Sequence, residues 1–449
     1  RGKLSMTIGE YRAAETWYRK ASRSVEIAFR DSPESRGVRF KRALIGAEIA
    51  RSLVGQGRLI EAEIQIRNVL RQTVSQVGPN AALTAVVLMK FTRVLQAQGR
   101  LAEATRMARK ILRIYAHIGV PDDSWQIANI RRLLAHNFVI GRQWDKALVE
   151  FEKIRLALQS DRNLFEKKFA RDLGRALALI GVDRHPEARE IAETVIAERI
   201  SRLGSKHYAT ARARGVLAMA LAAGGDTQNA LKHFGEALTI LMQWSRRSND
   251  VSSRGQSKWL SLIVESYLDL LARLQREGGR TPSGGDPAIV AFLVAQSTSD
   301  QSVQRAVRQS AARAAARNPQ LGDLARREQD TLKRIAALYS LLLHASSVPA
   351  QEKDPQAIAG LRRRIDRLRG ARAALADEIG QRFPEYSNLV SGKSTSVETA
   401  QAALRAGEAL IVTYVADRKS FIWAVPKSGK ITFNSAPLGN RRIAAAVRD

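Results

Sequence analysis

Cysteine is absent from this sequence of 449 residues, and histidine occurs only 6 times. Without cysteine the chain can form no disulfide, no thiolate metal site and no cysteine nucleophile. The histidines form no His-Glu-x-x-His motif and no spaced cluster with acidic residues. The sequence therefore predicts no metal ion and no other cofactor.

Long hydrophobic runs are also missing. A membrane-spanning helix needs roughly 18 consecutive apolar residues, and the longest apolar run, near Val216–Ala223, is far shorter. No signal peptide is visible, but the chain starts at Arg1 rather than at a methionine, so we expect it to be a piece of a longer protein. The compartment stays undecided: a cytoplasmic location is favoured, and export is the alternative.

The sequence has few acidic and few aromatic residues. There are 43 acidic against 73 basic residues, a net charge of +30, and aromatics make up 6% of the chain. Successive hundreds of residues carry +10, +4, +4 and +7, and the last 49 carry +5, so the excess is spread out. A nucleic-acid site usually concentrates its charge on one face. A basic solvated surface is the simpler interpretation, and an acidic protein or a nucleic acid is the alternative partner.

Catalytic motifs are not found. Ser391–Ser394 (SGKS) resembles the end of a phosphate-binding loop, but Ser387 stands where the first glycine is required, and no predicted strand precedes it. No other residues form a convergent catalytic constellation. The chain is therefore predicted not to be an enzyme by itself.

What the sequence does contain is a repeat of about 42 residues. A glycine is followed, five to seven residues later, by an alanine that opens an amphipathic pattern. The glycine–alanine couples are Gly9/Ala14, Gly57/Ala62, Gly99/Ala104, Gly141/Ala147, Gly181/Ala188 and Gly225/Ala230. Glycine can close one helix in the left-handed conformation, and alanine lets two antiparallel helices approach closely. Each helix pair then leaves an apolar face that only a neighbouring pair can cover.

These residues resemble tetratricopeptide repeats, in particular the longer repeats of kinesin light chains, and the match is best over Leu203–Leu238. The resemblance implies a right-handed solenoid that holds a protein ligand on its concave face, lined by the first helix of each pair. Counting back about 11 residues from each alanine gives Arg51, Arg93 and His136, and Asn129 and Arg132 are assigned to the turn before His136. In the next pair an insertion blurs the register and leaves Arg171 or Arg175, and the last pair has Arg212. Because guanidinium groups form forked hydrogen bonds to carboxylates, we predict a basic groove for an acidic segment or a peptide C-terminus. The alternative is that these arginines pair with acidic residues on neighbouring helices.

The repeat array forms the first predicted domain, 1–245. The rest of the chain divides into three further parts, 246–287, 288–390 and 391–449. A further helix, Trp259–Leu274, precedes a linker rich in glycine, proline and serine. Helices are expected next at 288–296 and 300–317, and then two long helices with heptad spacing form an antiparallel hairpin. Three apolar segments, Glu408–Ala416, Ser420–Pro426 and Lys430–Asn434, are predicted strands. The predicted fold class is mainly α, a solenoid followed by a hairpin and a small β/α fragment.

A second resemblance follows from this order of elements. A repeat array, a hairpin that includes LARREQD (Leu324–Asp330), the segment FPEYSNL (Phe383–Leu389) and the strand GEALIVTYV (Gly407–Val415) together are similar to bacterial proteins that join tetratricopeptide repeats to a CHAT domain. That family is caspase-like, and the resemblance implies that its catalytic histidine and cysteine lie beyond Asp449. The expected function is a protein-binding regulatory arm of a CHAT-type peptidase, with the missing CHAT domain as a partner in the same chain. The alternative is a basic module that associates with nucleic acid or a CRISPR-type ribonucleoprotein. No membrane partner is expected.

Overall fold

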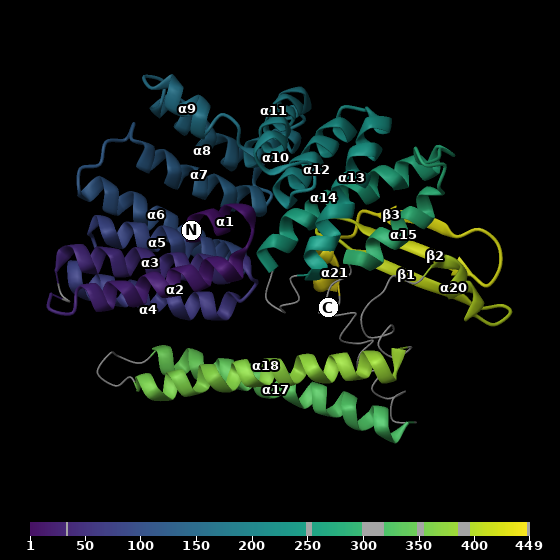
Figure 1. The fold of residues 1–449 in the computed structure, drawn as a ribbon. Helices are drawn as coiled ribbons and strands as arrows, with labels where there is room; N and C mark the ends of the chain where they lie inside the picture. The colour runs from purple at the N-terminus through teal and green to yellow at the C-terminus, as the bar shows by residue number, and fades with distance from the viewer. Residues whose placement is uncertain (33–34, 248–253, 299–317, 348–353, 385–395, 447–449) are drawn as a thin grey trace. The chain divides into compact units, whose positions relative to one another are not determined.

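A computed structural model describes residues 1–32, 35–247, 254–298, 318–347, 354–384 and 396–446 (Figure 1). The chain forms two compact units, Arg1–Leu270 and Leu271–Asp449. Both are mainly helical, and the second adds a three-stranded antiparallel sheet. The predicted fold class is therefore confirmed. The helix expected at 300–317 and the SGKS segment lie outside the described residues.

The first unit is a stack of antiparallel helix pairs. Each pair packs a first helix against a second, as in α3 with α4, α5 with α6, α7 with α8, and α12 with α13. The helices are α1 (Gly2–Ile8), α2 (Tyr11–Ala28), α3 (Arg36–Gly55), α4 (Leu59–Val77), α5 (Ala82–Ala97), α6 (Leu101–His117), α7 (Trp125–Ile140), α8 (Trp144–Ala157), α9 (Arg162–Lys168), α10 (Leu173–Ile180), α11 (His185–Leu203), α12 (Tyr208–Ala223), α13 (Thr227–Arg247) and α14 (Arg254–Arg276).

The repeated alanines lie in the core of the first unit. All six are completely buried, with 0% exposure: Ala14, Ala62, Ala104, Ala147, Ala188 and Ala230. A larger side chain at these positions would push the helices apart, because protein interiors are already close-packed. The expected role of the alanine is confirmed.

The turn between the helices of a pair is more regular than the glycines suggested. In every pair the residue five positions before the alanine has a positive φ: Gly9, Gly57, Gly99, Arg142, Asp183 and Gly225. Gly141 and Gly181, which the sequence marked as the turn residues of two pairs, have φ values of −81° and −67° instead. Gly181 is required for another reason, since a Cβ atom there would lie 2.4 Å from the ring of Trp144.

A polar network joins neighbouring pairs and repeats itself. Glu63, which follows Ala62, accepts hydrogen bonds from Gln98 Nε2 at 2.7 Å and from Arg100 Nη1 at 2.8 Å in the next turn. Glu15, which follows Ala14, is contacted in the same way by Gln56 at 2.7 Å and Arg58 at 2.8 Å. In these two turns, the Gln-Gly-Arg sequence thus binds the carboxylate of the preceding pair.

Two elements depart from the regular pairs. α14 packs on the last pair, where Tyr267 lies 4.9 Å from Phe234 between ring centroids, and Ile263 covers the face of Gly215. The compact unit therefore extends past the boundary expected at residue 245. The second departure is α9, which is inserted before α10, so that α10 has only 8 residues where α5, α7 and α12 have 16.

The second unit contains α15 (Pro287–Thr298), α17 (Pro319–Ser347), α18 (Pro355–Arg382), α20 (Val397–Ala402), β1 (Ala409–Val415), β2 (Ser420–Pro426), β3 (Thr432–Ala436) and α21 (Asn440–Ala446). α17 and α18 form the predicted hairpin, with Leu324 and Leu375 in its seam. The strands run in the order β1-β2-β3 and pair antiparallel, with Val412 opposite Trp423. Trp423 is fully buried, and its Nε1 donates to the carbonyl of Ala288 at 3.1 Å.

Candidate functional site

The first helices of successive pairs lie against one another. α3 packs on α5, α7 on α10, and α10 on α12. Gln96 of α5 donates to Asn137 of α7 at 2.6 Å, which joins the third and fourth pairs. We call α3, α5, α7, α10 and α12 the first-helix layer. Solenoids of stacked helix pairs use the concave side of such a layer as an extended binding surface.

Three arginines follow one another across this layer. Arg51 of α3 and Arg93 of α5 occupy equivalent positions, six residues before the left-handed residue of their turn, and Arg132 of α7 lies one turn earlier than the equivalent His136. We call Arg51, Arg93 and Arg132 the arginine row. Arg93 is open to solvent, but the surrounding protein partly desolvates it, and this lowers its pKa. The charges of Arg132 and Arg51 lower the pKa further, which places Arg93 between them.

Few carboxylates neutralise the row. Glu48 accepts a hydrogen bond from Lys90 Nζ at 2.7 Å and pairs with Arg51 at 3.1 Å. Arg93 forms no hydrogen bond or ion pair with its side chain among the residues that the structure describes. This part of the layer therefore presents four cations, the row and Lys90, near two carboxylates, Glu48 and the Asp172 that pairs with His136.

Arg132 is held in place by its neighbours. Its Nη1 donates to the carbonyl of Lys168 at 2.9 Å, its Nη2 donates to Asn129 Oδ1 at 2.8 Å, and its guanidinium lies 5.0 Å from the ring centroid of Phe169. Asn129 in turn lies 3.2 Å from the sulfur of Met89 through its Nδ2. These direct partners are neutral groups, which fix the guanidinium and leave the nearby Asp172 carboxylate as an opposite charge that acts on it.

His136 is occupied by a contact inside the array. Its Nε2 lies 2.7 Å from Asp172 Oδ1, and the same oxygen accepts the backbone N–H of Gly174 at 2.7 Å. Burial would raise the pKa of Asp172, but the charge and hydrogen bond of His136, the charge of Arg132 and the Gly174 N–H hold it at about 2. The pair therefore positions α10 and leaves His136 poorly suited to a ligand.

Arg212 lies near the Arg51 end of the row, although it belongs to the last pair. Its guanidinium is 4.7 Å from the ring centroid of Trp259. Its Nε is buried without a hydrogen-bond partner in the described part of the chain. Burial raises the pKa of Tyr11, and the charges of Arg212 and Arg51 both oppose this, so the two arginines approach the same tyrosine. Burial and Arg212 lower the pKa of Arg199 to about 10.

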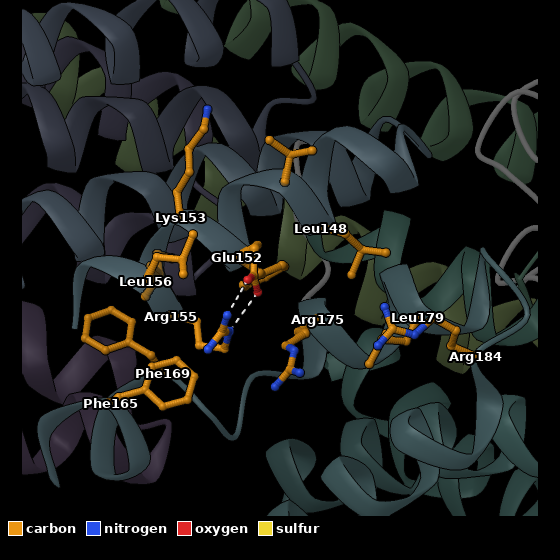
Figure 2. A pocket seen from close by; sticks show the side chains of 13 residues that line it. Leu148, Glu152, Lys153, Arg155, Leu156, Phe165, Phe169, Arg175, Leu179 and Arg184 are labelled. Carbon is orange, nitrogen blue, oxygen red and sulfur yellow. Dashed lines mark hydrogen bonds and ion pairs between the residues drawn. The ribbon is translucent and has the colours of Figure 1, made fainter. Parts of the chain in front are cut away.

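The two remaining predicted arginines do not join the row. Arg171 precedes α10 and pairs with Glu198 of α11. Arg175 lies on α10 and faces α8 across a hollow (Figure 2). The residue of α10 at the position equivalent to Arg93 is Leu177, which is 2% exposed. The row is interrupted here because α9 displaces the start of the first helix.

Sequence reasoning missed Lys90, Glu48 and Arg199. Lys90 and Glu48 stand nine residues before the left-handed residues of their turns, so a comparison of equivalent positions in the two helices would have found them. Arg199 lies on a second helix, α11, and the packing of α11 on α12 brings it to Arg212.

A metal centre is not formed by the residues that the structure describes, since no three of their His, Asp and Glu side chains gather in a group able to bind an ion. None of the helices in the same ranges combines the length and the apolar character needed to cross a membrane.

Comparison with family models matches two stretches of the array. Residues 84–118 and residues 171–243 each match a tetratricopeptide repeat model. Tetratricopeptide repeats are therefore present in this chain. They include α5 with α6, and α10 to α13, which agrees with the helix pairs of the structure. Comparison with curated proteins gives no match.

Solved structures with similar helix arrays are distant in sequence. A putative kinesin light chain of Podospora anserina with nearly identical TPR-like repeats is 20% identical, with 46% of this chain and 97% of that chain covered and a TM-score of 0.35. BtubC (BKLC) of P. vanneervenii is 15% identical, covering 52% and 92%, with a TM-score of 0.37. A Rap protein complexed with competence and sporulation factor is 13% identical, covering 83% and 97%, with a TM-score of 0.44.

Proposed function

We propose that this chain is a protein-binding scaffold whose arginine row holds an acidic segment of a partner protein. The observation that carries the proposal is Arg93, an accessible cation that forms no side-chain hydrogen bond or ion pair in the described residues and is flanked by Arg51 and Arg132 on the neighbouring helices. Bringing like charges together costs free energy, and an arriving carboxylate recovers that cost and adds forked hydrogen bonds. An anionic ligand therefore binds where the array is electrostatically least satisfied.

The dimensions of the row favour an extended chain over a small anion. Packed helices lie about 8–10 Å apart, so guanidiniums on α3, α5 and α7 span roughly 20 Å. An extended peptide advances about 3.3 Å per residue, so five to seven residues would cover the row. Carboxylates at every second or third position would match the spacing of successive arginines.

The proposal is tested by charge reversal. The tagged full chain and an Arg51→Glu/Arg93→Glu variant capture proteins from an extract of the source cells, and the bound proteins are identified. A control variant, Arg363→Glu/Arg367→Glu, changes the net charge equally on exposed positions of α18. We expect partners that the wild type and the control retain and the row variant loses. Equal capture by all three chains would contradict the proposal.

A finer proposal is that the scaffold serves a CHAT-type peptidase domain. Its support is the order of elements, in which the helical hairpin α17–α18 is followed by α20 and by a meander of three strands. The array itself would be the non-catalytic sensing arm. Sequencing the transcript past the codon for Asp449 tests this: a strand segment with histidine followed by one with cysteine supports it, and an open reading frame without them contradicts it.

Nucleic acid is the competing ligand class, because the chain carries a net charge of +30. The two classes differ in salt dependence and in the residues they require. Titration with a single-stranded RNA of about 20 nucleotides at several salt concentrations separates them, since displaced counterions give a steep slope. Strong, steeply salt-dependent RNA binding that survives the Arg51→Glu/Arg93→Glu change would favour the basic surface as a whole.

A further inference from the structure

A hollow of about 430 Å³ opens beside α10 because that helix is short. In a regular pair, the first two turns of the first helix would pack against the preceding second helix. Here α10 begins only at Leu173, and α9 with Phe169 covers part of the space that is left. α8 forms one wall, α9 and α10 form the others, and the hollow stays open to solvent (Figure 2).

The lining joins an apolar floor to a basic rim. Phe165, Phe169, Leu148 and Leu179 contribute apolar surface, and Val149 and Leu156 of α8 are 52% and 48% exposed. The charged lining residues are Lys153, Arg155, Arg175 and Arg184 against the single carboxylate of Glu152. Lys153 pairs with Glu150 at 2.9 Å. The hollow therefore offers an aromatic and aliphatic surface beside basic residues of which most are paired.

The arginines of the rim are not equally available. Arg155 forms two hydrogen bonds with Glu152, at 2.5 and 2.9 Å, and Arg184 forms two with Glu187, at 2.6 and 2.8 Å. Arg175 lies between these pairs in Figure 2, and in the described residues its side chain has no hydrogen-bond or ion-pair partner. The pKa of Glu152 is lowered mainly by its hydrogen bonds from Arg155. The charge of Arg175 also lowers it, without a direct contact. Arg175 is thus a half-buried cation that no carboxylate contacts directly in the described part of the chain.

We propose that this hollow is a second recognition site, which takes an aromatic side chain of a protein ligand together with a neighbouring carboxylate. The aromatic ring packs on Phe165 and Phe169, where ring pairs favour edge-to-face or offset contacts. The adjacent carboxylate accepts hydrogen bonds from the guanidinium of Arg175. The walls of the hollow come from α8, α9 and α10, and the hollow meets the arginine row at Phe169, whose ring lies 5.0 Å from the guanidinium of Arg132. The proposal stands even if the row binds nothing.

Three peptides test the chemistry of the site on the full chain. The probe is a fluorescein-labelled, C-terminally amidated peptide of sequence GSEFESG, and the matched controls are GSQFQSG and GSESESG. Fluorescence anisotropy measures binding. The proposal expects saturable binding of the probe and at least about tenfold weaker binding of each control, because one lacks the charge and the other lacks the ring.

Variants locate the site. Arg175→Gln should weaken binding of the probe about tenfold, and Val149→Gln, at the exposed mouth, should weaken it too. Lys146→Gln on the same helix, outside the hollow, and Arg93→Gln in the row should leave it unchanged. Thermal melting verifies that each variant is folded. No saturable binding to the wild type, or equal binding to Arg175→Gln and wild type, would overturn the proposal, as would a loss seen only in Arg93→Gln.

Discussion

Replacement of Glu63 by glutamine removes one charge from the polar network between the second and third pairs. The Glu63 carboxylate is 8% exposed and accepts from Gln98 at 2.7 Å, Arg100 at 2.8 Å and Arg67 at 2.8 Å. Burial opposes its ionisation, but these hydrogen bonds lower the pKa of Glu63 below its ordinary value. The carboxylate is therefore more stable as an anion in the folded array than in the unfolded chain.

The size of the effect follows from what the donors do after the change. A hydrogen bond to a charged group contributes about 1.5–3 kcal/mol, but the side chains of Arg67 and Arg100 are 44% and 34% exposed, so water can solvate them again. Glu63→Gln also turns an amide NH₂ toward these donors. We expect a loss of about 2 kcal/mol in the free energy of unfolding, which is less than the sum of the three bonds.

Glu103→Gln is the matched control. Glu103 binds the same Arg100 at 2.6 Å, but its side chain is 37% exposed, and surface pairs contribute about 0–1 kcal/mol. Urea unfolding followed by circular dichroism at pH 7 compares both variants with the wild type. Because the pKa of Glu63 is lowered on folding, its contribution is present above the unfolded pKa and is lost as the pH falls through the folded one. Equal destabilisation by the two substitutions, or a Glu63→Gln effect that grows at low pH, would refute the reasoning.

Three further predictions concern the array. Asp172→Asn should destabilise by about 2 kcal/mol near pH 6, since the pKa of Asp172 falls from 3.8 to about 2 on folding, and urea unfolding should show the difference shrinking as the pH drops from about 4 to 2. Gly181→Ala should lower the free energy of unfolding by about 1–3 kcal/mol, because its Cβ would lie 2.4 Å from the rigid ring of Trp144. Gly224→Ala, whose new Cβ would have its nearest contact at 3.3 Å, should lower it less. Thermal melts of the two variants check this, and equal shifts of the melting temperature would contradict it. Asp183→Gly should raise the melting temperature slightly, because φ is 60° there and glycine adopts this conformation without strain; an unchanged or lower melting temperature counts against it.

The repeat could be predicted from the sequence because its signals are local. A buried alanine recurs in all six pairs about every 42 residues, and glycine occupies the positive-φ turn position in four of them. The strands were predictable for a similar reason, since β2 spans Ser420–Pro426, the apolar segment from which it was predicted. Local sterics and side-chain burial decide such features, and both leave a periodic trace in the sequence.

Only the tertiary structure decided which arginines share one surface. Arg51 and Arg93 stand at equivalent positions, so counting residues found them, but Arg175 was drawn to the same row by counting and instead faces a hollow made by α9. The charges of Arg212 and Arg51 both act on Tyr11, although the two arginines belong to the last and the second pair. The array brings them together because it curves, and curvature accumulates from small rotations between many pairs. No single segment of the sequence determines the total rotation. The positions of the arginines could therefore be counted where the repeat is regular, and not where the insertion of α9 breaks it.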